Sequence, residues 1–262
     1  MTIAAQTPHR YQPSRSPLAK IKRRMTQWRA VKPMLETPEN TIITFTFDDF
    51  PRSAARYGAE ILERYDARGA YYACTGYMGG KGPGGDYYTA EDLIGLSRRG
   101  HEIAAHSHRH INCAENRPQD ALSDIETNLD AFSTVGLSRP PAHFAYPYGE
   151  TCHNLKTRLA ERFDTCRGVL PGINRAGSDL TQLRAVELGD SDSAMARAER
   201  AIETAARSPG WLVFFTHDVQ PTPTRFGISP AKLDRLVKRA KDSGAIIATP
   251  SQAMAQIHRA PS

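Results

Sequence analysis

The sequence predicts an α/β fold, a distorted (β/α)7 barrel of the TIM type with mainly parallel strands. Strand-like and helix-like segments alternate along the 262 residues, and this order is typical of parallel strands joined by right-handed crossovers. No Gly-x-Gly-x-x-Gly motif follows the first strand, which argues against a doubly wound dinucleotide-binding fold. Reactive polar residues follow several of the strands, as they do at the rim of β/α barrels.

The first predicted strand lies between Thr41 and Phe50, which reads TIITFTFDDF. Its β-branched and aromatic residues are typical of a buried strand. Two adjacent carboxylates, Asp48 and Asp49, stand where the strand ends. Neighbouring like charges raise each other's pKa unless a cation lies between them, so the pair predicts a metal site. A solvated turn is the alternative that the pair alone allows.

The later elements follow from apolar periodicity and from glycines that end helices. Helices are expected at 53–68, 90–99, 119–134, 154–162, 193–207 and 230–242, followed by a short final helix. Strands are expected at 70–74, 102–105, 143–147, 165–169, 185–188, 211–216 and 245–248. The glycine-rich segment 76–86 lacks the Gly-Lys-Ser/Thr of a phosphate-binding loop. It is interpreted as a mobile loop beside the site, with Tyr87 and Tyr88 as candidate sugar platforms.

The net charge of +6 comes from the start of the chain. Eight of the 34 basic residues precede Glu36, the first acid, which leaves 26 basic against 28 acidic residues in the rest. The charge therefore indicates no nucleic-acid-binding domain. We divide the chain into a basic arm, 1–38, and a catalytic domain, 39–262.

The arm is predicted to contain an amphipathic helix. Its apolar residues recur at helical spacing and are Leu18, Ile21, Met25 and Trp28. Packing of this stripe on the domain is favoured, and peripheral contact with an anionic membrane surface is the alternative.

Location and thiol chemistry are predicted from what the sequence lacks. The chain shows no apolar run that could span a bilayer and no secretion signal, so we expect a cytoplasmic protein, with the inner membrane face as its alternative place. The cysteines at 74, 113, 152 and 166 show no C-x-x-C pair. Free thiols are expected, with a Cys152–Cys166 bridge as the alternative. The sequence does not determine the oligomeric state.

Two histidines follow the strand 102–105. His106 and His110 are four residues apart, which on a helical turn places both imidazoles on one face. Together with one carboxylate of the Asp48–Asp49 pair they offer two nitrogens and one carboxylate, a set that leaves coordination positions open and is typical of a catalytic metal. His108 lies between them and is expected to point away.

Two further strands end in candidate site residues. The strand 143–147 ends with Tyr146 and Pro147, and Tyr148 follows it. The apolar strand 211–216 is followed by His217, with Asp218 beside it. A histidine in such a place suits a general acid. A histidine that is merely hydrogen-bonded at the barrel mouth is the alternative.

The chain resembles the polysaccharide deacetylases of the NodB-homology group, carbohydrate esterase family 4. The resemblance rests on four motifs in the family's order, which are TFDD (46–49), HSHRH (106–110), AYPYG (145–149) and FFTH (214–217). They span 41–218, so the basic arm lies outside the resemblance.

The resemblance implies a role for each matching residue. Asp48 would be the general base that activates water, and Asp49, His106 and His110 would bind a divalent metal, with zinc expected and cobalt, manganese or nickel as alternatives. His217 would protonate the leaving amine, and the backbone N–H of Tyr148 would help to hold the oxyanion. Tyr146, Pro147, Arg167 and Phe50 are candidates for substrate contacts.

The chain departs from the family pattern in three places. Ala145 stands where the family often has an arginine that pairs with the base, and Arg167 is our candidate for the replacing cation. Phe50 stands where glycine is usual, and would narrow the floor of the site or change the turn. The family's Asp-x-x-Asp-Trp segment is missing, and the loop 167–183 occupies its place.

The resulting functional hypothesis is metal-dependent hydrolysis of N-acetyl groups on amino sugars in oligosaccharides, polysaccharides or glycolipids. A related amidase, O-acetyl esterase or deformylase is the enzymatic alternative. The alternative from another class is a glycan-binding domain that has lost turnover. The complete acid, base and metal set argues against that last alternative.

Overall fold

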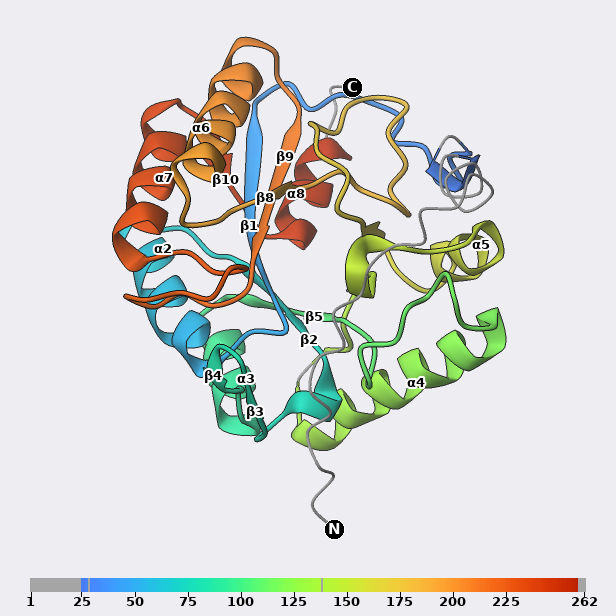
Figure 1. Cartoon of the computed structure of the whole chain (residues 1–262). Coiled ribbons are helices and arrows are strands. Elements are labelled where there is room, and N and C mark those ends of the chain that lie inside the picture. Colours follow the sequence, from blue (N-terminus) through green and yellow to red (C-terminus); the bar gives the residue numbers. More distant parts are fainter. Residues whose placement is uncertain (1–24, 28, 138, 259–262) are drawn as a thin grey trace.

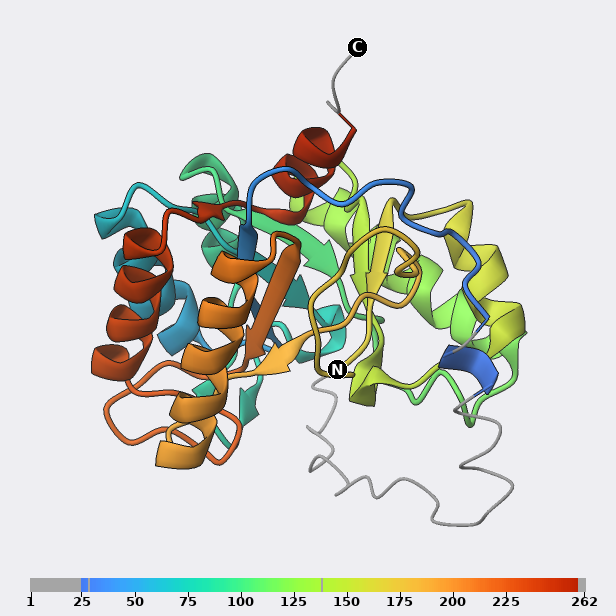
Figure 2. The same cartoon turned by 90° about the horizontal axis from the view of Figure 1, so that it is seen from above.

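The computed structural model describes residues 25–27, 29–137 and 139–258. Its main sheet has eight strands, and every neighbouring pair in it is parallel. The strand order is β7-β6-β5-β2-β1-β9-β8, and β10 pairs with β1. Helices surround the curved sheet (Figures 1 and 2). The predicted barrel-like α/β fold is confirmed.

The strands lie close to their predicted positions. In the main sheet they are β1 (Ile42–Asp48), β2 (Ala70–Ala73), β5 (Glu102–Ala105), β6 (His143–Ala145), β7 (Thr165–Arg167), β8 (Val186–Glu187), β9 (Trp211–Thr216) and β10 (Ile246–Ile247). A separate hairpin consists of β3 (Lys81–Gly82) and β4 (Gly85–Asp86). This hairpin lies within the glycine-rich segment 76–86, which the sequence predicted to be a loop without strands.

The helices alternate with these strands. The α-helices are α2 (Ala59–Arg64), α3 (Ala90–Arg98), α4 (Pro118–Val135), α5 (His153–Ala160), α6 (Asp192–Arg207), α7 (Pro230–Asp242) and α8 (Pro250–Ile257). Short helical turns are η1 (Ala54–Gly58), η2 (Thr75–Tyr77) and η3 (Pro147–Gly149). The helix predicted at 53–68 is thus a π-helical turn followed by α2. It ends early because the chain turns at Asp66, which has a positive φ.

The central strand β1 is buried along its whole length. Ile43, Phe45 and Phe47 belong to the large core beneath the helices, so the alternate residues face the barrel interior. There Thr44 accepts a hydrogen bond from the Trp211 indole (2.8 Å). A strand that is buried on both faces must satisfy its inward polar groups inside the barrel.

The two edges of the sheet are joined by the segment between β7 and β8. The N–H of Leu183 donates to Cys166 O (2.8 Å), and the N–H of Gly168 donates to Leu183 O (3.0 Å). Three residues after Leu183, Val186 pairs with Phe214 of β9. The segment 180–186 therefore contacts both edge regions and closes the barrel.

The described part of the basic arm packs on the domain. Met34 is buried in a core cluster with Leu180 and Leu183, and Pro33 pairs with Asp179. Leu18, Ile21 and Trp28 of the predicted amphipathic helix lie outside the described residues. Met25, which is described, is 56% exposed.

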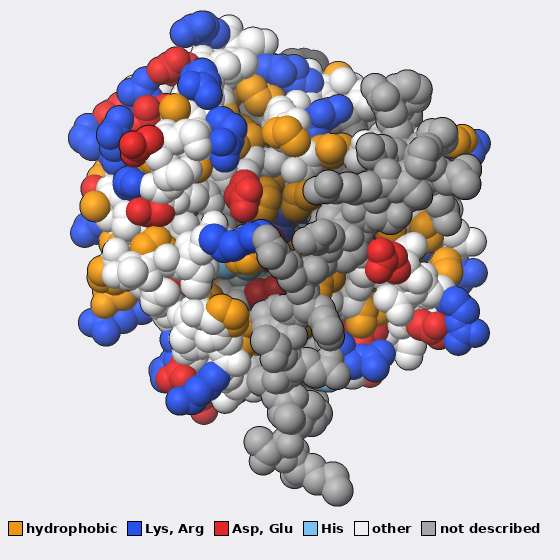
Figure 3. Space-filling model, in the orientation of Figure 1, with side chains coloured by type: hydrophobic (Ala, Val, Ile, Leu, Met, Phe, Trp, Pro, Cys, Tyr) orange, Lys and Arg blue, Asp and Glu red, His pale blue; other side chains and the backbone are white. Residues whose placement is uncertain are grey.

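The remaining sequence expectations concern thiols and membrane spans. All four cysteines are free, so the Cys152–Cys166 alternative is not formed. Among the described residues, no helix combines the length and apolar character needed to cross a bilayer. Acidic and basic side chains are interspersed on the face shown in Figure 3.

A buried histidine ties the beginnings of three strands to α8. The His143 ring contacts Thr165 Oγ1 (2.8 Å) and Ser251 Oγ (3.0 Å), and its Nε2 lies 3.2 Å from Glu102 Oε1. Burial lowers the pKa of His143, although the Glu102 carboxylate acts in the opposite direction.

We predict that His143 makes the protein less stable in acid. Its folded pKa lies below its unfolded value, so the unfolded chain binds more protons as the pH falls below about 6.5. The free energy of unfolding should therefore decrease between about pH 7.5 and about pH 5.5. Urea unfolding at both pH values should show a smaller decrease in His143→Gln than in the wild type. An equal decrease in both proteins would contradict the prediction.

Candidate active site

Four segments that are distant in the sequence meet at the carboxyl ends of the strands. Asp48 and Asp49 end β1, the segment 106–110 follows β5, the segment 146–149 follows β6, and His217 follows β9. Because parallel strands all end at the same edge, this order alone brings the four segments to one rim. The rest of the geometry depends on how each loop turns.

Asp49, His106 and His110 form a compact cluster of metal-ligating groups. Their donor atoms all lie within 4.8 Å of one another. Asp49 Oδ2 is 2.8 Å from His110 Nε2, and Asp49 Oδ1 is 3.9 Å from His106 Nε2. The structure thus brings together the three residues that the sequence suggested as ligands.

The two imidazoles are brought together by an irregular loop and not by the predicted helical turn. Residues 106–110 form an irregular loop in which Ser107 and His110 have positive φ angles of 62° and 54°. Asp49, with φ 43°, also has this left-handed conformation. Non-glycine residues adopt it rarely and at some energetic cost, and such residues gather at functional sites.

The electrostatics of the cluster suit a bound cation. Burial on its own would raise the pKa of Asp49, but the nearby His110 and His106 lower it to about 2. Burial lowers the pKa of His106 against the pull of Asp49. The cluster therefore combines an ionised carboxylate with a histidine whose neutral, ligating form is favoured.

The donor set fits a divalent metal. Asp49 Oδ1 is buried and has no hydrogen-bond partner among the described residues. His106 Nδ1 lies 2.8 Å from Ala145 O, so that nitrogen carries the proton and the Nε2 lone pair faces the cluster. Two imidazole nitrogens and one carboxylate oxygen are a ligand set typical of catalytic zinc, and they also suit cobalt, manganese or nickel.

Helix α4 holds the histidine loop in place, a role that sequence reasoning missed. Asn128 Oδ1 accepts the N–H of His106 (3.3 Å). Asp124 Oδ2 accepts the N–H groups of His108 (2.8 Å) and Arg109 (3.1 Å). Asp124 and Asn128 are buried and lie on the apolar stripe of α4. The presence of two polar residues within an apolar stripe is the sequence feature that could have identified this supporting role.

His108 lies outside the ligand cluster, as expected. Its Nδ1 lies 3.0 Å from Thr75 Oγ1, and its backbone oxygen accepts the N–H of Gly76 (2.8 Å). The residue therefore links the histidine loop to the turn after β2.

Asp48 points into the barrel and pairs with Arg167. One guanidinium nitrogen lies 2.5 Å from each carboxylate oxygen of Asp48. The guanidinium also lies over the rings of Tyr72 (5.0 Å) and Phe215 (5.1 Å). Arg167 and Ala145 are register partners on β7 and β6. The cation that the family often carries on the third motif thus comes from the adjacent strand.

His217 reaches the rim and forms no ion pair with a carboxylate of the described residues, although it helps to lower the pKa of Asp49. Its Nδ1 is buried and makes no hydrogen bond to a described residue, and its ring lies 5.3 Å from that of Phe226. Asp218, which the sequence suggested as its companion, turns away. The Asp218 carboxylate instead accepts hydrogen bonds from Gln220 (2.9 Å) and the Thr224 N–H (2.8 Å).

Tyrosines line the rim beside His110. The Tyr148 ring lies 4.6 Å from the His110 ring, and Tyr77, which sequence reasoning missed, lies 6.0 Å from it. Tyr87 stacks on Tyr77 at 4.9 Å. Tyr77, Tyr87 and Tyr148 are partly exposed, so they can contact a ligand at this rim.

The other residues proposed for substrate contacts lie beneath the surface, which corrects the sequence interpretation. Phe50 is fully buried between Tyr71 and Tyr88, so Tyr88 is a core residue and not a sugar platform. Tyr146 is buried, and its hydroxyl donates to Thr181 O (2.9 Å). Pro147 and Arg167, which the sequence also suggested for substrate contacts, are buried as well.

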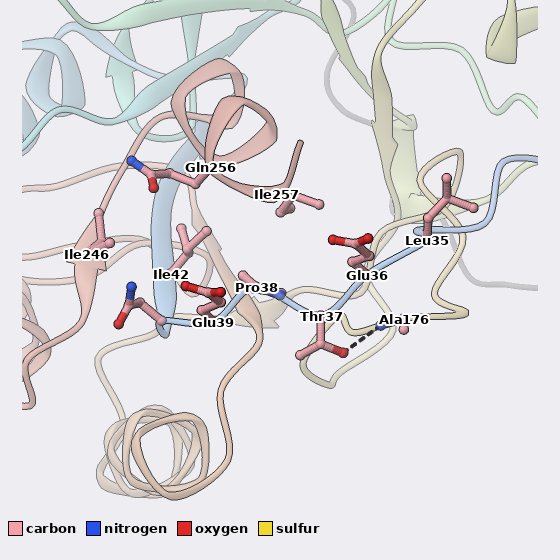
Figure 4. Close-up of a pocket in the computed structure, with 11 residues that line it drawn as sticks. Leu35, Glu36, Thr37, Pro38, Glu39, Ile42, Ala176, Ile246, Gln256 and Ile257 are labelled. Atoms are coloured by element: carbon pink, nitrogen blue, oxygen red, sulfur yellow. Dashed lines mark hydrogen bonds between the residues drawn. The ribbon is translucent and has the colours of Figure 1, made fainter. Parts of the chain in front are cut away.

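A separate hollow of about 600 Å³ lies at the opposite end of the barrel, where β1 and β10 begin (Figure 4). Its floor includes Ile42, Ile246 and Ile257, and its charged residues are Glu36 and Glu39. Its described lining residues include no histidine, cysteine or basic side chain. The hollow therefore lacks the metal-ligating and acid–base groups found at the rim.

Comparisons with known proteins show similarity to one protein family and to several solved structures. Residues 36–163 match the family model described as polysaccharide deacetylase. The matched range contains Asp48, Asp49, His106 and His110, whereas Arg167 lies beyond it. A search of curated proteins found no match.

Several solved structures have a similar fold. One is a chitin deacetylase from the fungal pathogen Colletotrichum lindemuthianum (13% identity, TM-score 0.61, 86% of this chain and 92% of that chain). Another is a family 4 acetyl xylan esterase from Clostridium thermocellum in complex with a cobalt ion (19%, 0.56, 82% and 91%). A third is the peptidoglycan deacetylase PdaC from Bacillus subtilis (18%, 0.54, 85% and 94%). At such identities the likeness establishes the shared fold.

We predict that His106→Ala weakens zinc binding by at least about 100-fold, because it removes a ligand and not merely a supporting hydrogen bond. Calorimetric titration of chelator-treated protein with Zn²⁺ measures the change. His108→Ala is the matched control and should stay within a few-fold of the wild type. Equal losses in the two variants would show that the ligands are wrongly assigned.

We also predict that Arg167→Ala lowers turnover by about 100- to 1000-fold, because it leaves Asp48 unpaired and free to rotate. The double variant Ala145→Arg/Arg167→Ala should recover part of the loss, since it places a guanidinium on the register partner. Turnover of the three proteins and their melting temperatures provide the measurement. A double variant no better than Arg167→Ala, despite normal folding, would contradict this role.

Proposed function

We propose that this chain, a member of the polysaccharide deacetylase family, removes N-acetyl groups from amino sugars in an oligosaccharide, polysaccharide or glycolipid. Polysaccharide deacetylases are hydrolases of carbon–nitrogen bonds other than peptide bonds. The observation that carries the proposal is the Asp49–His106–His110 cluster next to a carboxylate, Asp48, that is fixed by Arg167.

A divalent metal held by Asp49, His106 and His110 would polarise the acetyl carbonyl and make water more acidic. Zinc is the metal we propose, with cobalt, manganese and nickel as alternatives. The protein orients one member of this ligand set, His106, through its contacts with Ala145 and Asn128.

Asp48 is the general base of the proposed reaction. It accepts a proton from water as the water oxygen bonds to the acetyl carbon. Arg167 contacts both of its carboxylate oxygens, which restricts rotation of the carboxylate. Because a general base acts only within hydrogen-bonding distance of its proton, this restriction should raise the fraction of productive encounters.

His217 and Tyr148 complete the proposed reaction. As the carbon–nitrogen bond breaks, the leaving nitrogen takes a proton from His217, and acetate and a free amine are the products. The backbone N–H of Tyr148, in a residue with φ 60°, is proposed to donate to the oxyanion that develops on the former carbonyl oxygen.

One observation favours a second candidate, hydrolysis of O-acetyl esters. His217 Nδ1 is buried without a partner, and no carboxylate of a described residue lies within 4.0 Å of the His217 ring nitrogens. When Nδ1 carries a hydrogen, this buried N–H has no acceptor among the described residues. An alkoxide needs less protonation to leave than an amide nitrogen does, so an ester makes a smaller demand on His217.

We predict acetate release from N-acetylglucosamine oligomers, lost on chelation and restored by Zn²⁺ or Co²⁺. Mass spectrometry should show a loss of about 42 Da for each acetyl group removed, a mass set by acetyl chemistry. Asp48→Asn should abolish release by at least about 1000-fold while still binding metal. Acetate release from O-acetylated glycans alone would favour the ester candidate. Sugar binding without turnover of any acetylated substrate would contradict the proposed function.

A further inference from the structure

We infer that the segment 29–34, which precedes the family-matched region, is part of the apparatus that positions Asp48, and that Lys156 is the positioning residue that anchors it. The chain of contacts runs from Lys156 through residues 180–183, which belong to the barrel-closing segment 180–186, to Arg167. The inference rests on the proposed function only for its kinetic readout.

Lys156 is a cation buried between the arm and the domain. Its side chain is fully inaccessible, and its Nζ lies 2.6 Å from Asp179 Oδ2. The same nitrogen donates to the backbone oxygens of Thr26 (2.8 Å) and Arg29 (3.1 Å) and to Gln182 Oε1 (3.2 Å). A buried ammonium group is tolerated only with such compensation. The arm thus supplies part of the shell that makes this buried charge stable.

The arm also pairs directly with the segment next to Asp179. Its backbone hydrogen bonds are Met34 N to Ser178 O (2.7 Å), Gly177 N to Met34 O (2.8 Å) and Leu180 N to Lys32 O (2.8 Å). Asp179 Oδ1 accepts the N–H of Lys32 (3.2 Å) and that of Thr181 (3.0 Å). Segment 177–181 is therefore held between the arm on one side and Lys156 on the other.

Residues 180–183 form backbone hydrogen bonds with Cys166 and Gly168, the two neighbours of Arg167. Cys166 N donates to Leu180 O (2.8 Å), Leu183 N donates to Cys166 O (2.8 Å), and Gly168 N donates to Leu183 O (3.0 Å). Arg167 in turn donates to Gly168 O (3.0 Å) and to both oxygens of Asp48. A shift of this segment would therefore move the guanidinium that orients the base.

The position of the arginine explains why this chain needs such an anchor. Strand β7 has three residues and one neighbour in the sheet, β6. An arginine at position 145 would stand on β6, which has a strand on each side. This chain has Ala145 on β6 and carries the cation, Arg167, on the edge strand β7. The side of β7 that does not face β6 is therefore hydrogen-bonded by the barrel-closing segment. The arm and Lys156 hold that segment.

The kinetic test is Lys156→Met, which keeps side-chain length and removes the charge. We expect kcat to fall about tenfold, with KM and Zn²⁺ affinity within twofold of the wild type. In the Arg167→Ala background, Lys156→Met should cause no further fall in kcat, because both changes act on the same contact. Lys238→Met, which removes an exposed ion pair with Asp242 on α7, is the matched control and should leave kcat unchanged.

A merely structural role gives different results. Multiplicative losses in the double variant, or an effect confined to KM, would overturn the inference. If Lys156→Met does not fold, Asp179→Asn removes the negative partner of the same ion pair and is subject to the same expectations.

A second readout needs no turnover. Hydrogen exchange of the Leu183 and Gly168 amides should be at least about tenfold faster in Lys156→Met than in the wild type, while the amides of β1 keep their protection. Unchanged exchange at these two amides would overturn the inference. An inactive wild type would refute the proposed function, and the exchange rates would still decide the role of Lys156.

Discussion

The buried ion pair between Asp48 and Arg167 is the interaction on which the rest of this structure depends. Both residues are almost inaccessible to solvent, with exposed fractions of 4% and 1%. Removing such a charge from water costs several kcal/mol for each ion, and only a pair with good geometry offsets this cost. Asp48 comes from the central strand β1 and Arg167 from the edge strand β7. The pair can form only if the sheet curves until these two strands face each other across the interior. The curvature and closure of the sheet therefore determine whether Arg167 can orient the proposed general base, Asp48.

Asp48 and Asp49 are neighbours with opposite surroundings. Asp48 points inward to a guanidinium, whereas the positive φ of Asp49 turns the chain so that its carboxylate faces two imidazoles. This division solves the electrostatic difficulty of adjacent carboxylates, because each has its own cationic or cation-binding partner. Helix α4 serves the same arrangement from outside the barrel, since Asp124 and Asn128 fix the loop that carries the imidazoles. These hydrogen bonds tie the histidine loop to a regular element of the fold.

The correspondence between sequence and structure differs from residue to residue. His106 and His110 were identified as a pair, but their four-residue spacing suggested a helical turn, and the structure uses left-handed residues in an irregular loop. Phe50 and Tyr146 stand inside recognisable motifs and yet face the core, since a motif marks a chain position and not the direction of a side chain. Asp218 does not pair with His217, and its carboxylate accepts hydrogen bonds from the Thr224 N–H and Gln220 instead.

The sequence by itself determined the alternation of strands and helices and the rim at which the motifs gather. Each of these follows from local periodicity or from the rule that parallel strands end at one edge. Only the tertiary structure decided that the arm pairs with 177–180, that Lys156 lies buried beneath it, and that two polar residues of α4 support the histidines. Those contacts join residues up to 148 positions apart, as in the hydrogen bond between Leu180 N and Lys32 O. They depend on strand register and barrel closure, which no local pattern encodes.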